Sequence, residues 1–434
     1  MLTPPVREPS YGTGVDGVKI DVQSGVPALG GGVGGGPHLA KMYTKAMEAS
    51  VAEHFPVGQP EAATSDGDAA ATTISTPTAV AGEGGVHCIN CMCHSTENLY
   101  QYSCTAVARA SDDFYPRRPD SHTVHLVNVA FNSAFLGEIC LPDWDMFHSL
   151  HEVGWLHAAA RAVGGCPVYV SDAPGEHDIP LLRTLVLPDG SVLRARLPGR
   201  PTRDCLFCDV GGDGKSALKI WNANSVGGVV GAFHVQGVSW DWRTRENART
   251  DEAPPPLTAS VRPCDVETLR GVSGPFAAWR HRGGRVSVLG TAESAVDIHL
   301  RHREWEIVTM VPIQYLAATA AHTSVAWAPL GLGEMLNSGG ALVDAGQLFD
   351  MPDGGAQTTV TVRGPGKMHA YCQPAPTRVL LAPDANTDAS GEGEPPTELP
   401  FRHDVESGKL EVVLPEDRPV AHLVVEWGGA REES

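Results

Sequence analysis

The string DGVKIDV, residues 16–22, places a lysine and a carboxylate where they could act together. Successive side chains of a strand point to opposite faces, so Lys19 and Asp21 would share one face and the neighbouring apolar residues the other. The positive charge of Lys19 favours the ionised form of Asp21, as a carboxylate nucleophile requires. The alternative is a buried ion pair that only closes the strand.

A second charged cluster is RASDD, residues 109–113. Two adjacent carboxylates repel each other, which raises the pKa of one of them and suits a general acid. Counting along a strand from Arg109 places Ser111 and Asp113 on its face and Asp112 on the other. Asp113 is therefore the better candidate for proton transfer. The alternative is that the acidic pair begins a loop or caps the next helix.

Acidic residues also follow two later apolar runs. LPDWDMFHSLH holds Asp143 and Asp145 on either side of Trp144, and YVSD ends at Asp172. Sugar sites use such acids to accept hydrogen bonds from hydroxyls, and an aromatic ring to stack on the sugar. These residues are candidates for substrate binding, with core packing as the alternative for Trp144.

The string HCINCMCH, residues 87–94, could suggest a metal site. Strong zinc sites use two separated ligand pairs, whereas Cys91 and Cys93 would share one strand face. The other close pair is Cys205 and Cys208. We therefore expect no metal and no other cofactor.

The elements that must position these residues follow an α/β pattern up to about residue 187. Apolar runs predict strands at 15–22, 86–92, 105–110, 137–141 and 167–171, and helical spacing predicts helices at 38–55, 121–135, 150–163 and 177–185. A complete (β/α)8 barrel takes about 250 residues, so this segment accommodates only its second half, about strands 4–8. Active sites of such barrels lie at the C-terminal ends of the strands, where the acids fall.

From about residue 190 the pattern changes to short β-runs with turn signals, which predict an antiparallel β-sandwich. The predicted fold class is therefore α/β plus all-β. We expect a partial TIM barrel over residues 1–189 and the sandwich over 190–434, with low-complexity insertions at 25–37 and 56–85 that form surface loops.

The amino-acid composition indicates which partners and which cellular compartment to expect. The 434 residues include 51 acidic and 32 basic side chains, a formal charge of −19 that repels nucleic acids and anionic membranes. No window approaches the roughly 18 apolar residues of a membrane span, and the first residues do not resemble a signal peptide. Ten cysteines are too few for a disulfide scaffold. We expect the reducing cytoplasm, with a plastid as the alternative.

Several strings together resemble plant raffinose synthases and seed imbibition proteins, the alkaline α-galactosidase branch of glycoside hydrolase family 36. The resemblance runs from about residue 11 to 350 and rests on DGVKIDVQ, CMCHSTENLY, RASDDFYPRRPDSHTVH, LPDWDMFHSLH and LKIWNANSVGGVVGAF.

The resemblance implies a retaining mechanism on α-galactosides such as raffinose or galactinol. The family's K-x-D motif matches Lys19 to Asp21, which makes Asp21 the nucleophile and Lys19 a ligand of galactose hydroxyls. Its R-x-x-x-D motif matches Arg109 to Asp113, which makes Asp113 the acid/base and Arg109 a sugar ligand. Retention requires the two carboxyl groups to lie about 5–5.5 Å apart.

Within the family, raffinose synthases carry an insertion after the DDF of the acid/base motif. This sequence runs from Asp113 through Pro116 to His122 without such an insertion. This favours the seed imbibition or α-galactosidase branch, with galactinol–sucrose galactosyltransferase as the alternative. Family members also place a β-sandwich and three barrel strands before the nucleophile, so we expect a chain truncated at its N-terminus. A noncatalytic fragment that only binds galactosides is a second alternative.

Overall fold

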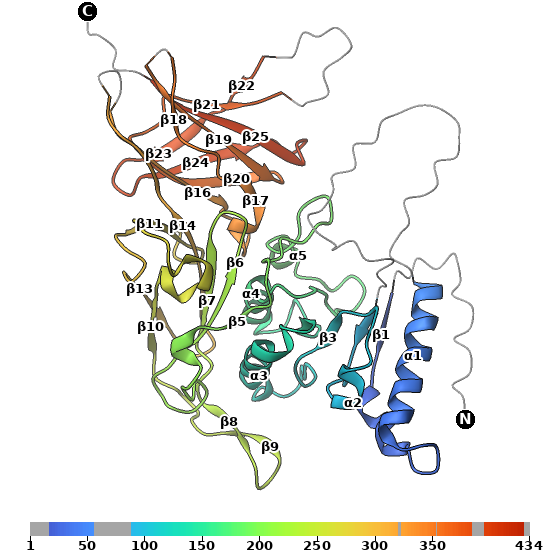
Figure 1. Cartoon of the computed structure of the whole chain (residues 1–434). Helices are drawn as coiled ribbons and strands as arrows, with labels where there is room; N and C mark the ends of the chain where they lie inside the picture. Colours follow the sequence, from blue (N-terminus) through green and yellow to red (C-terminus); the bar gives the residue numbers. More distant parts are fainter. Residues whose placement is uncertain (1–16, 56–87, 320–322, 353, 384–394, 429–434) are drawn as a thin grey trace, which may run out of the picture. The chain divides into compact units, whose positions relative to one another are not determined.

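The computed structural model describes residues 17–55, 88–319, 323–352, 354–383 and 395–428 (Figure 1). The chain forms two compact units, and each is described by itself. The first unit comprises Met1–Ala110 and Leu136–Asp143, and the second comprises Ser111–Phe135 and Trp144–Ser434. The predicted insertion at 56–85 lies outside the described residues.

A four-stranded parallel sheet forms the centre of the first unit. Its strands pair in chain order: β1 (Val18–Ile20), β2 (Cys88–Asn90), β3 (Val107–Arg109) and β4 (Leu141–Asp143). Parallel neighbours need crossover connections, and the helices of this unit, α1 (Gly36–His54) and α2 (Thr96–Leu99), lie in two of them. The α/β expectation is confirmed for this sheet, and its membership of a barrel stays a prediction.

Two of the strand predictions differ from the structure. Residues 137–140 form a turn, because the amides of Ile139 and Cys140 donate to the Leu136 carbonyl at 3.0 and 2.9 Å. Pairing begins only at Leu141, whose amide donates to the carbonyl of Ala106 on the β3 side at 2.7 Å. The segment 167–171 contributes a single parallel bridge, between Phe147 and Val170. Part of 25–37, predicted as an irregular insertion, lies in the 3-10 helix Gln23–Leu29 and in α1.

Helix α1 buries one face of residues at helical spacing, namely Ala40, Thr44, Met47, Glu48 and Val51. Glu48 is the charged member of this face. Its carboxylate accepts hydrogen bonds from the amides of Ser103, Cys104 and Thr105, and from two hydroxyls of the same segment, at 2.6–3.1 Å. Burial by itself would raise the pKa of Glu48, but these hydrogen bonds lower it below the ordinary 4.5. The carboxylate thus holds the chain that leads into β3.

We predict that Glu48→Gln lowers the free energy of unfolding by about 2 kcal/mol or more at pH 7, because an amide N–H₂ would face backbone donors. Since the pKa of Glu48 is lowered on folding, its contribution is present above pH 4.5 and fades as the pH falls below it. Urea unfolding at pH 7 and at pH 4 measures both effects. Glu53→Gln, an exposed change on the same helix, should alter neither, and equal effects of the two changes would contradict the prediction.

The second unit contains the helices α3 (Ser121–Leu136, ending at the first residue of the other unit), α4 (Gly154–Gly164) and α5 (Ile179–Leu182). Helix α4 is buried on nearly every side, as expected for a helix that packs inside a domain. It contacts strands β6, β7 and β14 of the same unit. The helix ends at Gly165, whose φ of 65° favours glycine and where a Cβ would collide with the Leu197 carbonyl.

Every strand pairing in the described residues from 200 onward is antiparallel. The first group comprises β5 (Arg200–Pro201), β6 (Leu218–Ala223), β7 (Gly228–Phe233), β8 (Val238–Asp241), β9 (Glu246–Arg249), β10 (Leu257–Val261), β11 (Phe276–Arg280), β12 (Arg285–Leu289), β13 (Val296–Leu300) and β14 (Trp305–Pro312). The second group comprises β15 (Gln314–Leu316), β16 (Val325–Leu332), β17 (Leu342–Asp344), β18 (Phe349–Asp350), β19 (Ala356–Arg363), β20 (Gly366–Gln373), β21 (Arg378–Leu381), β22 (Thr397–Glu398), β23 (Phe401–Asp404), β24 (Lys409–Leu414) and β25 (Val420–Trp427). Short 3-10 helices lie at Arg203–Cys205, Pro263–Asp265, Glu267–Leu269 and Ser338–Ala341.

These strands form two layered bodies in the green-to-yellow and the orange-to-red parts of Figure 1. In the first, the sheet β12-β11-β14-β7-β6-β5 shares an apolar core with the ribbon β10-β13. In the second, the sheet β15-β16-β20-β24-β23 shares a core with β17-β19-β25-β21-β22, where Trp327 and Trp427 meet at 5.9 Å between ring centroids. The antiparallel β structure is as predicted, and the domain change near 190 stays a prediction.

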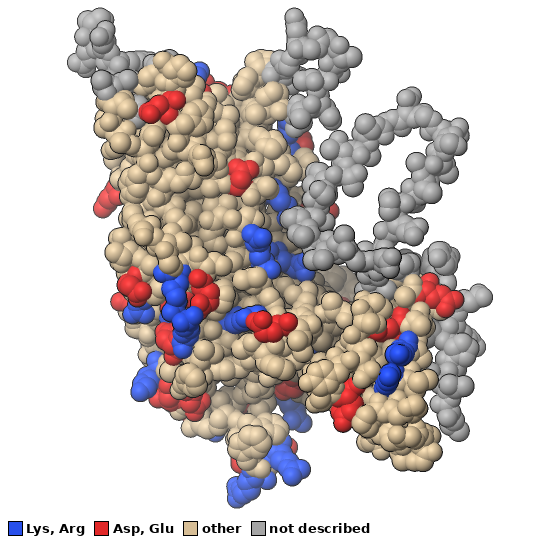
Figure 2. Space-filling model, in the orientation of Figure 1, with Lys and Arg blue, Asp and Glu red and all other residues tan. Residues whose placement is uncertain are grey.

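Acidic and basic side chains are interspersed on the face of the molecule that Figure 2 shows. Among the described residues, no helix combines the length and the apolar character needed to cross a bilayer.

Candidate active site

The carboxylate of Asp21 lies directly beyond β1, in the first unit. The backbone amide of Val22 donates to Asp21 Oδ1 at 2.6 Å. Val22 itself has a φ of 60° and a ψ of 22°, a left-handed conformation that a β-branched residue rarely adopts. Such a conformation costs about 1–3 kcal/mol and typically persists where the surrounding structure holds it, often at functional sites. The turn after β1 therefore holds Asp21 in a defined place.

Three side chains act on this carboxylate. The pKa of Asp21 is lowered by the hydrogen bond from the Val22 amide, by a hydrogen bond from Cys91, and by the charges of Arg109 and Lys19. Burial raises the pKa of Cys91 to about 11, so the thiol stays protonated at neutral pH. Its S–H group donates a hydrogen bond to the Asp21 carboxylate. Arg109 Nη2 in turn donates to Cys91 Sγ at 3.3 Å. Asp21 is thus ionised at neutral pH in a positively charged setting.

Arg109 is the buried member of this group, with 3% of its surface exposed. It ends β3, and its carbonyl accepts a hydrogen bond from the His94 ring. Its register partner on β4 is Asp143, which is fully buried. Neighbouring register positions of a parallel sheet share a face, so Arg109 and Asp143 belong to one side of the sheet.

Left-handed backbone recurs at the ends of the parallel strands. Of the five non-glycine residues with positive φ among the described residues, three follow such strands: Val22 after β1, Met92 after β2 and Asp145 after β4. The other two are Arg245 and Arg303. Backbone strain is therefore concentrated at the strand ends where sequence analysis placed the candidate residues.

In the second unit, Asp112 and Asp113 belong to the loop that precedes α3. Both are exposed, and Asp112 Oδ1 lies 3.5 Å from His125 Nδ1. Phe114 fixes the loop, because its amide donates to Asp145 Oδ2 at 2.8 Å and its ring is buried against the rings of His148 and His157. Asp113 is thereby held on a solvent-exposed loop with a rigid anchor next to it.

Arg161 of α4 orders the loop after β4. Its guanidinium donates to the carbonyls of Trp144, Asp145 and Met146 at 2.5, 3.0 and 3.2 Å. The side chain is almost fully buried, at 1% exposed. A buried cation needs this many acceptors to offset its desolvation, so the loop and the arginine stabilise each other.

Trp144 and Asp172 have structural surroundings. The Trp144 ring is fully buried and packs against Gly164, so no surface of the ring is exposed to a sugar. Asp172 accepts hydrogen bonds from the Ser149 amide and hydroxyl at 2.7 and 2.6 Å and from the His177 ring at 3.1 Å. Burial would raise the pKa of Asp172, but these hydrogen bonds lower it, so the carboxylate ties two loops together.

Three buried histidines, His122, His125 and His157, lie near one another in the second unit. Arg161 determines the tautomers of His157 and His122. Arg161 Nη1 can only donate, so His157 Nδ1 accepts at 3.1 Å. His157 Nε2 must then carry the proton and donate to His122 Nδ1 at 2.9 Å. His125 Nε2 donates to the Trp144 carbonyl at 3.1 Å, which turns its Nδ1 toward Asp112. Burial and neighbouring positive charge lower the pKa of His122 to about 3 and that of His157 well below 6.5.

We predict that the protein loses stability as the pH falls below 6.5, because the unfolded chain then binds protons at His122 and His157 that the folded chain does not. The loss at pH 5 that is due to His122 is about 2 kcal/mol, and the lowered pKa of His157 acts in the same direction. Urea unfolding at pH 7.5 and pH 5, followed by tryptophan fluorescence, gives the difference. It should shrink by about that amount in His122→Gln and stay unchanged in His299→Gln, an exposed control. An unchanged difference in His122→Gln would show that the imidazole is protonated in the folded protein.

The predicted residues thus fall into two groups. The first unit brings Lys19, Asp21 and Arg109 together around Cys91, with Asp143 beside Arg109 on the sheet. In the second unit, Asp112 and Trp144 both contact His125, Asp113 is the next residue on the exposed loop, and Asp172 is bound by Ser149 and His177.

Sequence reasoning missed the contact of Cys91 with Asp21. The signal available was its position directly after the strand that neighbours β1. Among the described residues, no group of three or more His, Cys, Asp or Glu side chains is arranged to hold a metal ion. The cysteines of the string HCINCMCH that lie in the described part are instead buried thiols, whose pKa values burial raises.

Comparison with known proteins gives consistent relatives. Residues 10–80 and 78–394 match the family model described as raffinose synthase or seed imbibition protein Sip1. Probable galactinol–sucrose galactosyltransferase 6 of Arabidopsis thaliana is 43% identical over 375 residues, which cover 85% of this chain and 45% of that protein. A galactinol–sucrose galactosyltransferase of Oryza sativa subsp. japonica is 37% identical over 84% of this chain and 44% of its own length. The chain spans less than half the length of these relatives.

Among solved structures, α-galactosidase I from Mortierella vinacea aligns with a TM-score of 0.34 and 10% identity, over 52% of this chain and 58% of that chain. A β-L-arabinopyranosidase from Geobacillus stearothermophilus aligns with a TM-score of 0.38 and 12% identity, over 69% and 59%. These likenesses are too slight to support an inference. The match to the family model and the sequence relatives show that the chain belongs to the raffinose synthase and seed imbibition protein family.

Proposed function

We propose that this chain carries the catalytic carboxylates of an enzyme that transfers α-galactosyl groups, with Asp21 as the nucleophile. The observation that carries the proposal is the setting of Asp21: an ionised carboxylate on a strained turn at a strand end, with Arg109 and Lys19 close enough to lower its pKa. A nucleophilic carboxylate must be ionised and held in place before the substrate arrives.

The acid/base role falls to Asp113. In the first step Asp113 would protonate the glycosidic oxygen while Asp21 attacks the galactose C1, so that the old glycosidic bond breaks and a galactosyl ester forms. In the second step Asp113 would accept the proton of an acceptor hydroxyl, whose oxygen attacks C1 and releases Asp21. Lys19, Arg109 and Asp112 would bind sugar hydroxyls, and Asp143, which is fully buried, would support Arg109 from the neighbouring strand. Asp172 and Trp144, with their polar atoms or ring engaged inside the protein, would support the loops.

The acceptor decides between transfer and hydrolysis, since a sugar hydroxyl and water can react with the same intermediate. The relatives named galactinol–sucrose galactosyltransferase favour transfer from galactinol to sucrose, the alternative of the sequence analysis. Hydrolysis of α-galactosides is the second candidate, because the sequence from Asp113 to His122 lacks the insertion that the family's raffinose synthases carry. Both candidates use the same catalytic residues.

Two reactions, each followed by its product, test whether Asp21 is the nucleophile. Incubation with galactinol and sucrose should form raffinose, and incubation with raffinose alone should release galactose if the enzyme is a hydrolase. We predict that Asp21→Asn lowers either rate by about 10³-fold or more, while Glu53→Gln, a change at an exposed acid, leaves it unchanged. A wild-type protein that forms neither product, or an active Asp21→Asn variant, would refute the proposal.

Azide distinguishes a nucleophile from a structural carboxylate. In Asp21→Gly, azide should enter the vacated position, attack C1 of an activated α-galactoside and yield the β-galactosyl azide. In Asp113→Gly, azide should instead intercept the galactosyl ester and yield the α-galactosyl azide. Product analysis by NMR reads both configurations, and the same azide from both variants would contradict the assigned roles.

The double displacement also predicts retention of configuration. Galactose released from an α-galactoside should appear first as the α-anomer, which NMR can follow before mutarotation. Release of the β-anomer would mean a single displacement and carboxyl groups about 6.5–9.5 Å apart.

A further inference from the structure

A pocket of about 520 Å³ opens on the sheet β15-β16-β20-β24-β23 of the second unit. Its shape follows from the sheet register. Ala326 of β16 lies between Tyr315 of β15 and Gln373 of β20, and Ala328 lies beside Tyr371. Register partners share a face of the sheet, so small alanines in the middle strand leave a hollow between larger side chains.

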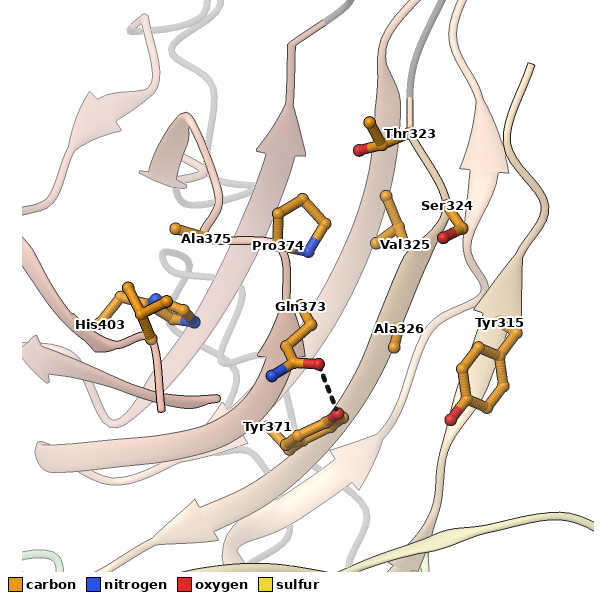
Figure 3. Close-up of a pocket in the computed structure, with 11 residues that line it drawn as sticks. Tyr315, Thr323, Ser324, Val325, Ala326, Tyr371, Gln373, Pro374, Ala375 and His403 are labelled. Carbon is orange, nitrogen blue, oxygen red and sulfur yellow. Dashed lines mark hydrogen bonds between the residues drawn. The ribbon is translucent and has the colours of Figure 1, made fainter. Parts of the chain in front are cut away.

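The polar side chains around this hollow are uncharged, and Val325, Pro374 and Val405 add apolar surface. Figure 3 shows Tyr371, Gln373 and Pro374 in a row, with Tyr315 on one side and His403 on the other. Thr323 and Ser324 add two hydroxyls, and no Asp, Glu, Lys or Arg is among the described residues that line the pocket. A lining of this kind suits a neutral, hydroxyl-rich ligand and offers no counter-charge to an ion.

The internal hydrogen bonds determine what the pocket presents. The Tyr371 hydroxyl donates to Gln373 Oε1 at 3.2 Å, which leaves the amide N–H groups of Gln373 as donors. His403 Nε2 donates to the Cys372 carbonyl at 3.0 Å, so Nδ1 of the neutral ring has an acceptor lone pair. This Nδ1 is itself buried, so it is not accessible to a ligand in the pocket. A sugar hydroxyl can accept from the amide of Gln373 and donate to the hydroxyl oxygen of the exposed Ser324, because it is both donor and acceptor.

Tyr315 supplies the remaining feature of a sugar site. Its side chain is 58% exposed, although a large aromatic group is usually packed. An exposed ring beside hydrogen-bonding groups can stack on the C–H face of a pyranose while its hydroxyl bonds at the edge. The Tyr315 phenol also lies close enough to Tyr371 to contribute to the raised pKa of Tyr371, for which burial is the main cause.

A second pocket, of about 620 Å³, differs in kind. Its charged side chains already pair with one another, Arg303 with Glu152 at 3.2 Å and Arg282 with Glu304 at 3.6 Å, and Trp305 is buried beneath them. That pocket presents charged pairs to a ligand rather than an uncharged lining.

We propose that the pocket formed by Tyr315, Tyr371, Gln373 and His403 binds a neutral saccharide, as a carbohydrate-binding site apart from the chemistry of Asp21 and Asp113. The site would hold one sugar ring by stacking on Tyr315 and by hydrogen bonds to Gln373 and Ser324. It carries no catalytic carboxylate and would serve to retain substrate or product on the protein.

Hydrogen–deuterium exchange with mass spectrometry tests the site locally. Raffinose at tens of millimolar should slow exchange in peptides covering 314–326 and 371–375. Tyr315→Ala and Gln373→Ala should each weaken this protection at least tenfold in apparent affinity, and their exposed positions make both variants compatible with an intact core. Tyr100→Ala, which removes a tyrosine that is 81% exposed elsewhere, should leave the protection unchanged.

Two further arms separate this proposal from the proposed function and from nonspecific sugar effects. Asp21→Asn should keep the protection, since the pocket does not use that carboxylate. Galacturonate at pH 8 should protect far less than galactose, because the lining holds no cation for its carboxylate. Three outcomes would each overturn the proposal. They are no protection of the wild-type protein, protection of the Tyr315→Ala and Gln373→Ala variants as strong as that of the wild type, and protection by galacturonate as strong as that by galactose.

Discussion

The loop at residues 144–146 of the second unit depends on the guanidinium of Arg161. This guanidinium is a buried cation that finds its acceptors in three successive carbonyls after β4 and in the ring of His157. Asp145, the middle residue of the three, adopts a positive φ. The same residue's carboxylate then anchors Phe114, next to the loop of Asp112 and Asp113. One buried charge thus determines the backbone of one loop and, through it, the anchor of another.

In the first unit a different balance holds the candidate nucleophile. Asp21 is exposed, yet its charge is stabilised by a backbone amide, a thiol and two cations. The buried partner is Arg109, held through its carbonyl by His94. The polar network of Glu48 positions the segment before β3, and hence the strand that carries Arg109. The electrostatic setting of the carboxylate therefore depends on residues far from it in sequence.

Local periodicity in the sequence was sufficient to predict much of this arrangement. The alternation in DGVKIDV predicted that Lys19 lies near enough to Asp21 to favour its ionised form, and helical spacing predicted α1, α3 and α4 within a few residues. The start of β4 was missed because residues 137–140, with Ile139 and Cys140 next to Leu141, fit a strand as well as a turn, and only the bond from Leu141 to Ala106 decides. Packing between distant segments decides whether Trp144 faces a ligand or the core. The contact of Cys91 with Asp21 depends on such packing too. Such contacts leave no periodic signal in one sequence.

Helix α4 has a consequence for how the protein is made. Its residues, 154–164, are buried against β6, β7 and β14, and β14 ends at Pro312. During synthesis the ribosome adds about 5–20 residues per second, so β14 follows the helix by on the order of ten seconds. Throughout that interval an apolar helix waits without its last partner strand. Helix α4 therefore completes its packing only after the chain has been made as far as residue 312.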